Sequence, residues 1–374
     1  MIDFLIGTVL PFLFVLGLVV FIHELGHYLA GRWCGIGAVA FSVGFGPEIV
    51  GFTDSRGTRW KLSLIPLGGY VRFVGDMNAA SATEAAQADA ELSEYERRYA
   101  FHNKSVLKRA ITVFAGPFAN YVLAIAIFTV LLSVNGRVII EPVVGEVRAE
   151  SAASDACIQV GDVFIEMDGA PVETFTQMQR YIAPRADQPI ELVVERNGEP
   201  VTLTLVPRRT EIEDQFGNKI EQGIIGIVAD ADTELRRRED ISVPGAFVMA
   251  HQETWYIVAR TGGYLANVIT GQERADQIGG PLRVADASRQ VATLGFVALL
   301  NLAAILSVSI GLLNLLPVPV LDGGHLMFYA VEAARGRPVS PRSQEFGYRI
   351  GFALLLGLMV FATWNDIQVF LNRL

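Results

Sequence analysis

Long apolar stretches alternate with polar segments along the chain. The apolar stretches cover about residues 2–30, 106–134, 294–316 and 351–370. Each reaches the roughly 20 residues that a helix needs to cross about 30 Å of hydrocarbon. The pattern therefore predicts about four transmembrane helices. The first stretch lacks a basic leading region and a small-residue cleavage site, so we expect a retained helix rather than a signal peptide.

Basic residues predict the orientation of these helices. They accumulate between the first and second stretches, and again between the third and fourth. The positive-inside rule places both connections in the cytoplasm, and the termini and the long central segment on the other side. The basic residues are Arg32, Arg56, Arg59, Lys61, Arg72, Arg97, Arg98, Lys104, Lys108 and Arg109 in the first connection and Arg335, Arg337, Arg342 and Arg349 in the second.

Composition supports a membrane protein with a water-soluble part. Hydrophobic residues make up 51% of the 374 residues, charged residues 18%, and the mean hydropathy is +0.38. The net charge of -9 argues against a nucleic-acid partner, which demands a basic surface. Cys34 and Cys157 are far apart and form no C-x-x-C pair, which excludes a disulfide framework and a cysteine zinc site.

The segments outside the apolar stretches have distinct patterns. Residues 38–74 alternate apolar and polar positions and are rich in glycine, which predicts short strands and hairpin turns. Residues 78–96 are rich in Ala, Glu and Ser, which predicts a mobile or loosely helical surface segment. Residues 243–280 have helical apolar spacing. They are interpreted as a helix on the outer membrane surface, a gate beside the spans, or a simple packing helix.

The central segment predicts a small mixed domain. Strand-like runs at 143–147, 163–167, 190–196 and 201–206 surround short helices near 151–157 and 175–182. Asp168-Gly169 and Asn197-Gly198 are typical of hairpin turns. The stretch "GEVRAESAASDACIQVGDVFIEMDGAPV" resembles a PDZ domain of the bacterial protease-associated kind. Such domains bind extended peptides by adding a strand to a sheet edge, which we expect here at 143–147.

A zinc motif ends the first apolar stretch. His23, Glu24 and His27 fit H-E-x-x-H. Residues four apart share one face of a helix, so both imidazoles can reach one zinc ion, and Glu24 beside them can act on water there. Ionisable groups near hydrocarbon usually face a cavity and mark function. The alternative is that the three residues lie past the membrane edge and satisfy one another's hydrogen-bonding groups.

A second polar site follows the third apolar stretch, in "NLLPVPVLDGGHL" at 314–326. Pro317 and Pro319 remove helix hydrogen bonds, and the following glycine pair loosens the chain again, which predicts a broken helix. Asp322 lies in this stretch, at the same cytoplasmic end as the zinc motif, and can supply the third ligand. His325 is a rival ligand, and spacing alone does not choose between the two.

The chain resembles the site-2 protease family of intramembrane zinc metalloproteases, in particular the bacterial regulator of sigma-E protease type with one PDZ domain. The resemblance rests on H-E-x-x-H, "VGFGPEI", the PDZ-like segment, "IGGPL" at 278–282 and N-x-x-P-x-P-x-L-D-G at 314–323. It implies zinc ligands His23, His27 and Asp322, a catalytic base at Glu24, and Asn314 near the substrate.

The glycine-rich segment is a further candidate for substrate binding. Gly44, Phe45 and Gly46 can supply a strand edge that holds an unwound substrate extended, or can form an ordinary hairpin turn. Both interpretations stay open from the sequence.

The resemblance implies a function and partners. The expected reaction is hydrolysis of a peptide bond in or next to the transmembrane segment of single-span proteins, such as anti-sigma-factor-like regulators or remnant signal peptides. The expected location is the bacterial inner membrane, with the termini and PDZ domain periplasmic and the zinc site toward the cytoplasm. Other expected partners are the lipid bilayer and peptide C-termini at the PDZ domain. Two alternatives are a membrane-anchored PDZ adaptor with a structural or inactive zinc site, and a membrane enzyme that acts on a non-peptide or prenylated substrate.

The expected fold is an α-helical membrane core of about four transmembrane helices with a cytoplasmic β-rich insert and a soluble α+β PDZ domain. In chain order the expected segments are a first transmembrane helix with the zinc motif (1–37), a cytoplasmic membrane-associated β-hairpin region (38–75), a cytoplasmic linker (76–104), a second transmembrane helix (105–135), a periplasmic PDZ domain (136–230), an amphipathic or gating segment (231–290), a third transmembrane helix with the proline motif (291–345) and a fourth (346–374).

Overall fold

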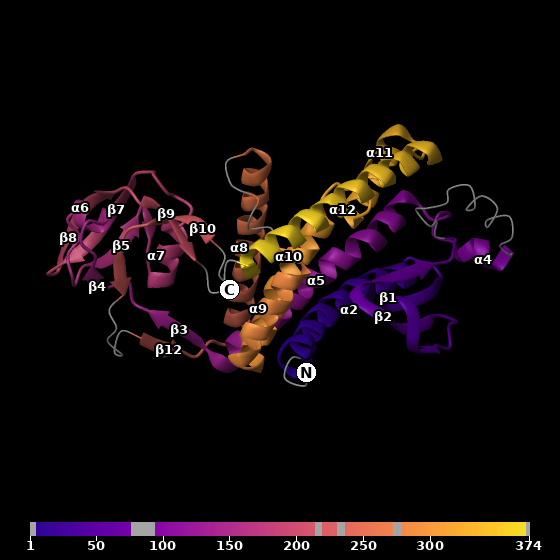
Figure 1. Cartoon of the computed structure of the whole chain (residues 1–374), viewed down its shortest axis with the longest axis horizontal. Helices are drawn as coiled ribbons and strands as arrows, with labels where there is room; N and C mark the ends of the chain where they lie inside the picture. The colour runs from indigo at the N-terminus through magenta and orange to yellow at the C-terminus, as the bar shows by residue number, and fades with distance from the viewer. Residues whose placement is uncertain are drawn as a thin grey trace. The chain divides into compact units, whose positions relative to one another are not determined.

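The computed structural model in Figure 1 describes residues 5–75, 94–213, 219–229, 236–271, 275 and 279–371. Most of the expected linker, the first residues of the first apolar stretch and Ile278 of the "IGGPL" motif lie outside these residues. The chain divides into two units. The first comprises Met1–Leu131 with Pro244–Leu374, and the second comprises Leu132–Val243.

Helices make up most of the first unit. Among the described residues, four segments are long and apolar enough to cross a membrane, at Leu5–Trp33, Val106–Asn135, Phe296–Asn314 and Pro341–Val369. The helices of this unit are π-helix η1 (Leu5–Val9), α2 (Leu10–Trp33), α4 (Glu94–Tyr99), α5 (Val106–Asn135), α8 (Val243–Ile269), α9 (Pro281–Thr293), α10 (Phe296–Asn314), α11 (Asp322–Arg335) and α12 (Pro341–Leu371). The prediction of about four membrane helices is confirmed by helix length and apolar composition.

Helix boundaries show where sequence patterns are weak guides. Helix α12 begins at Pro341, well before the apolar stretch at 351–370 that predicted it. Its start has a local signal, because Ser340 Oγ accepts a hydrogen bond from Ser343 N at 3.3 Å and proline suits the first helical position. Helical spacing was predicted over 243–280, and α8 ends at Ile269. A role as a gate stays a prediction.

Small residues bring the membrane helices close together. A methyl group at Gly26 of α2 would lie 2.3 Å from Ala115 O of α5, so these two backbones are in direct contact. Helix α5 therefore lies against the face of α2 that carries the zinc motif. Elsewhere on α2, Val15 packs with Leu299 and Ala303 of α10 in one buried cluster.

The β-rich insert is a long antiparallel pair, β1 (Ala38–Thr53) and β2 (Arg59–Phe73). The pair folds back on itself, because Ala40 pairs with both Arg72 and Arg59. Residues 59–62 consequently lie between two runs of β1. Phe41 stacks on Trp60 with ring centroids 4.3 Å apart, and its cluster includes Tyr28 of α2. The predicted hairpin is confirmed, and its core holds it against the zinc-motif helix.

The second unit is a mixed α+β body. Its largest sheet has the order β6-β5-β7-β8, and its core includes Val144, Phe164, Met178 and Leu192. Its elements are β3 (Arg137–Ile140), β4 (Val144–Val147), α6 (Ala152–Asp155), β5 (Val163–Met167), β6 (Ala170–Pro171), α7 (Phe175–Ile182), β7 (Ile190–Arg196), β8 (Glu199–Leu205), β9 (Arg208–Glu213), β10 (Lys219–Ile224), β11 (Ile227–Ala229) and β12 (Arg236–Glu239). The predicted strands and both short helices are confirmed.

The predicted turns of this unit are confirmed as well. Asn197 and Gly198 have φ of 52° and 85°, and Asp168 and Gly169 have φ of 47° and 80°. Two consecutive positive φ values are required for the tight hairpin turn that Asn-Gly and Asp-Gly favour. The Asn-Gly and Asp-Gly pairs were therefore sufficient to predict these two hairpin turns.

The predicted peptide-binding edge at 143–147 is not free at its first residues. Strand β4 pairs with β11 on one side, with Val147 opposite Ile227. On its other side, Val144 N donates to Asp162 O at 2.9 Å and Gly161 N donates to Val144 O at 2.8 Å. Both edges are therefore engaged at Val144. Within the described residues β11 has β4 as its only strand partner, so the available edge belongs to β11.

Candidate metal centre

The regular repeat of α2 places two imidazoles together. His23 and His27 are one turn apart, and their Nε2 atoms lie 3.2 Å from each other. His23 is 8% exposed, although it lies in a helix whose other buried residues are mainly apolar. The pattern of four-residue spacing thus produces the shared face that the sequence predicted.

A break between two helices supplies the third side chain. Helix α10 ends at Asn314 and α11 begins at Asp322, so the break predicted at the two prolines is confirmed. The glycines after Asp322 allow the chain to fold back tightly. A methyl group would lie 2.2 Å from Leu315 O at Gly323, and 2.3 Å from Val318 O at Gly324. Only glycine fits at these two positions without moving the turn.

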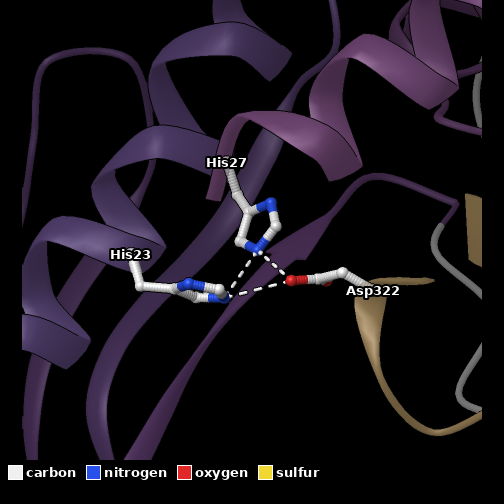
Figure 2. A group of neighbouring side chains, drawn as sticks. All are labelled: His23, His27 and Asp322. Carbon is white, nitrogen blue, oxygen red and sulfur yellow. Dashed lines mark hydrogen bonds and ion pairs between the residues drawn. The ribbon is translucent and has the colours of Figure 1, made fainter. Parts of the chain in front are cut away.

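The three side chains point to one place (Figure 2). Asp322 Oδ2 lies 3.1 Å from His23 Nε2 and 3.4 Å from His27 Nε2. A tetrahedral zinc ion with bonds of about 2.0–2.1 Å holds its ligand atoms about 3.3 Å apart. The observed triangle of 3.1, 3.4 and 3.2 Å matches one face of such a tetrahedron. The residues therefore fit zinc and leave a fourth position for water or substrate.

The surroundings of His27 support the same assignment. His27 Nδ1 lies 3.0 Å from Thr112 O of α5. A carbonyl oxygen only accepts hydrogen bonds, so Nδ1 must carry the proton. In the neutral ring Nε2 then has a free lone pair, which faces the triangle. His23 Nδ1 in turn lies 3.3 Å from the amide group of Asn120.

Glu24 lies beside the triangle and outside it. The residue is 8% exposed, although it can carry a charge. A methyl group at Gly69 would come within 2.9 Å of Glu24 Cγ, so glycine lets β2 approach α2 here. The hairpin therefore lies against the Glu24 side chain, next to the metal-ligand face of the helix.

The rival ligand His325 has a different partner. His325 Nδ1 lies 3.2 Å from Tyr348 Oη of α12. Among the described residues, the one group of His, Cys, Asp or Glu side chains suited to hold a metal ion is His23, His27 and Asp322. The structure thus brings Asp322, and not His325, to the two histidines.

The residues predicted to bind substrate lie in two elements. Asn314 is the last residue of α10, and its amide donates to Ile310 O at 3.1 Å. Gly44 and Gly46 have φ of 91° and 84° inside β1, so this segment is an irregular strand. Phe45 stacks on Tyr70 of β2 with ring centroids 6.1 Å apart. A role for these residues in substrate binding stays a prediction.

Sequence reasoning missed the support from α5. Thr112, Gly116 and Asn120 repeat every four residues along one face, and a methyl group at Gly116 would lie 2.2 Å from His27 Nε2. Asn120 carried a usable signal, because an amide in the middle of an apolar span needs a partner. The Thr112 carbonyl carried none, because every residue has a backbone carbonyl.

The sequence also matches known proteins over nearly its whole length. Residues 11–358 match peptidase family M50. A protein of Agrobacterium fabrum named as a zinc metalloprotease is 55% identical, and the match covers 98% of this chain and 97% of that protein. A protein of Mesorhizobium japonicum with the same kind of name is 50% identical over 97% of this chain and 99% of its own length. The metalloprotease MmpA of Caulobacter vibrioides is 40% identical over 98% of this chain and 97% of its own length.

These matches agree with the zinc-sized triangle and with the helices that can cross a membrane. They support metalloprotease activity and zinc as the cofactor. The chain therefore belongs to peptidase family M50, the site-2 protease family, and is a zinc metalloprotease of the membrane.

Proposed function

We propose that the chain is an intramembrane protease that cuts single-span membrane proteins within or next to their transmembrane segment. Anti-sigma-factor-like regulators and remnant signal peptides are the proposed substrates. One observation carries the proposal. The zinc-sized triangle is formed by two side chains of α2, a helix able to span a membrane, and by one side chain at the end of the chain break that follows α10.

The residues have separate chemical roles. His23, His27 and Asp322 hold the metal, which when bound polarises a carbonyl and makes water nucleophilic at neutral pH. Glu24 is the catalytic base. It takes a proton from the attacking water and delivers it to the amine that leaves. Strand β2 lies against the Glu24 side chain at Gly69.

A transmembrane substrate must be unwound before this reaction. Its carbonyls are engaged in internal helix hydrogen bonds, so a cleavable segment has to become extended. The β1–β2 hairpin approaches Glu24 at Gly69 and offers strand edges to such a segment. We assign Gly44, Phe45 and Gly46 to this contact, and Asn314 to the opposite side of the substrate.

The second unit is proposed to be a periplasmic PDZ domain. Its strands, its two short helices and its hairpin turns follow the PDZ-like sequence pattern. The available edge of β11 is the proposed site for an extended peptide or a peptide C-terminus. The placement of basic residues supports this orientation, with both termini outside and the zinc site toward the cytoplasmic face of the bacterial inner membrane.

The test is cleavage by the purified full chain reconstituted with candidate single-span substrates. Glu24→Gln keeps the shape of the side chain and removes the base, so we expect zinc content as in the wild type and a rate lower by about 10²- to 10⁴-fold. A Glu24→Gln protein that cuts at the wild-type rate contradicts the role of Glu24. A zinc-loaded wild type that leaves every membrane substrate intact contradicts the proposed function.

Substrate class is tested in the same assay. An extended soluble peptide of the cleaved sequence is the matched control for the same sequence inside a transmembrane helix. We expect helix-destabilising residues near the cleavage site of the membrane substrate to raise its rate, because unwinding is required first. Preferential cleavage of soluble peptides that have no membrane segment contradicts an intramembrane substrate.

A further inference from the structure

Asn120 is a fully buried amide in the middle of an apolar helix. It is 0% exposed and lies in α5, one of the helices long enough to cross a membrane. Its position is fixed from α10, because Ser307 Oγ donates to Asn120 O at 3.0 Å and a methyl group at Gly311 would lie 3.2 Å from Asn120 Cβ. A buried amide is destabilising unless it is hydrogen-bonded, so this one requires a partner.

Its contact with His23 identifies that partner. The terminal nitrogen of Asn120, Nδ2, lies 3.3 Å from His23 Nδ1. Asn120 Oδ1 is buried and has no hydrogen-bond partner in the described part of the chain. A rotation of 180° about the last side-chain bond exchanges the two ends of the amide, which have nearly the same shape. One end therefore faces the imidazole in either orientation.

The chemistry of His23 decides which end it is. His23 Nε2 faces Asp322 Oδ2 at 3.1 Å and His27 Nε2 at 3.2 Å, so this nitrogen is the one that must offer a lone pair to zinc. The proton of the neutral ring then resides on Nδ1, which becomes a donor. A donor needs an acceptor, and only the oxygen of the amide can accept.

We propose that Asn120 is a positioning residue for the metal centre, whose Oδ1 accepts a hydrogen bond from His23 Nδ1–H. The bond fixes the tautomer and the ring plane of His23 so that Nε2 faces the other two ligands. The proposal rests on the zinc-ligand role of His23 proposed above. Ligating histidines generally donate their second ring nitrogen to such an acceptor, and this one comes from a different helix.

The four-residue spacing along α5 explains how this helix contacts both histidines. Thr112 O accepts from His27 Nδ1, and Asn120 lies two turns further along the same face beside His23. Gly116 lies between them, where any side chain would meet His27 Nε2. The two histidines are one turn apart on α2, so one face of α5 orients both rings.

The test is zinc affinity of the purified full-length protein, measured by competition with a chelator. Asn120→Leu removes the acceptor with little change in volume, and we expect zinc to bind about 10- to 100-fold more weakly. Asn120→Asp keeps an acceptor oxygen, and we expect an affinity at or above that of the wild type. In cobalt-substituted protein, the visible absorption of Asn120→Asp should match the wild type and that of Asn120→Leu should differ. Thr129→Val in the same helix is the control, because Thr129 Oγ1 donates to Ile125 O of its own helix.

Two results would overturn the proposal. The first is wild-type zinc affinity in Asn120→Leu. The second is an affinity of Asn120→Asp as low as about 10- to 100-fold below the wild type, as expected if the amide donated to His23 instead. This second result decides the question even where Asn120→Leu does not fold. Zinc affinity is measured without cleavage, so a wild type that binds zinc but cuts no membrane substrate contradicts the proposed function and leaves the test of Asn120 valid.

Discussion

The metal centre joins two regions that position their side chains in different ways. Helix α2 presents His23 and His27 through its regular repeat, and the neighbouring α5 braces both rings. Asp322 comes from the break between α10 and α11, where the backbone is irregular and two glycines lie against carbonyl oxygens. The first region depends on side-chain contacts between continuous helices. The second depends on the path of the backbone itself, so equivalent substitutions should have different consequences in the two regions.

Removal of Asp322 should have the largest effect. Asp322→Ala leaves two imidazoles, and a zinc site with three protein ligands loses one of them outright. We expect zinc to be lost at concentrations that saturate the wild type, a larger reduction than the roughly 10- to 100-fold expected for a supporting residue. Metal content after dialysis measures the result.

His325→Ala is the matched control for this change, because His325 was the rival ligand and lies in the same turn of α11. It should retain zinc, since its ring contacts Tyr348 rather than the triangle. Loss of zinc in His325→Ala with retention in Asp322→Ala would reverse the assignment of the third ligand.

Two glycine substitutions separate the regions more finely. In Gly116→Ala the new methyl group meets His27 Nε2 at 2.2 Å, and in Gly323→Ala it meets Leu315 O at 2.2 Å. The first displaces a side chain, while alanine favours the helix by up to about 1 kcal/mol, so zinc affinity should fall with the melting temperature preserved. The second displaces backbone, so we expect about 1–3 kcal/mol of destabilisation together with weaker zinc binding.

Gly17→Ala is the control for both changes, because a methyl group at Gly17 of α2 meets nothing within 4 Å. Thermal unfolding of the full chain in detergent and zinc competition are measured on all three variants. Equal losses of stability in Gly116→Ala and Gly323→Ala would show that the two regions do not differ in the way described.

The same contrast explains how far the sequence could lead. The H-E-x-x-H face followed from helix periodicity alone, and the chain break followed from Pro317 and Pro319, because both effects are local. The choice between Asp322 and His325 could not follow from spacing, since it depends on which side of α11 faces α2. The resemblance to a family favoured Asp322, and the distances of 3.1 and 3.4 Å to the two imidazoles agree with that choice.

Contacts between segments that are distant in the chain could not be predicted from the sequence. Ala40 pairs with both Arg59 and Arg72, and no local sequence pattern predicts this strand register. The resemblance to PDZ domains predicted a peptide-binding edge at β4, yet β11 pairs with one side of this strand and the segment around Asp162 bonds the other side at Val144. Fold class and candidate ligands therefore follow from patterns of residues, whereas the partners of backbone groups follow from the assembled structure.

A smaller effect is expected where the hairpin is tied to α2. Asp54, between β1 and β2, accepts hydrogen bonds from Trp60 Nε1 at 3.1 Å and Tyr28 Oη at 3.2 Å, and from the backbone of Arg56 and Thr58 at 2.8 and 2.9 Å. These bonds, that of Trp60 foremost, lower the pKa of Asp54 to about 2 from its ordinary 3.8. Tyr28 directly follows His27, so this tie reaches the helix turn that carries the zinc motif.

The lowered pKa fixes the sign of the pH dependence. A carboxylate with a folded-state pKa below its unfolded value adds stability that is fully present above about pH 4 and disappears as the pH falls through about 2. Asp54→Asn cannot ionise, so its melting temperature should fall less steeply than that of the wild type between these pH values. Thermal unfolding of the full chain in detergent at a series of pH values checks this. Equal slopes in the two proteins would mean that Asp54 does not tie the hairpin to the helix through its charge.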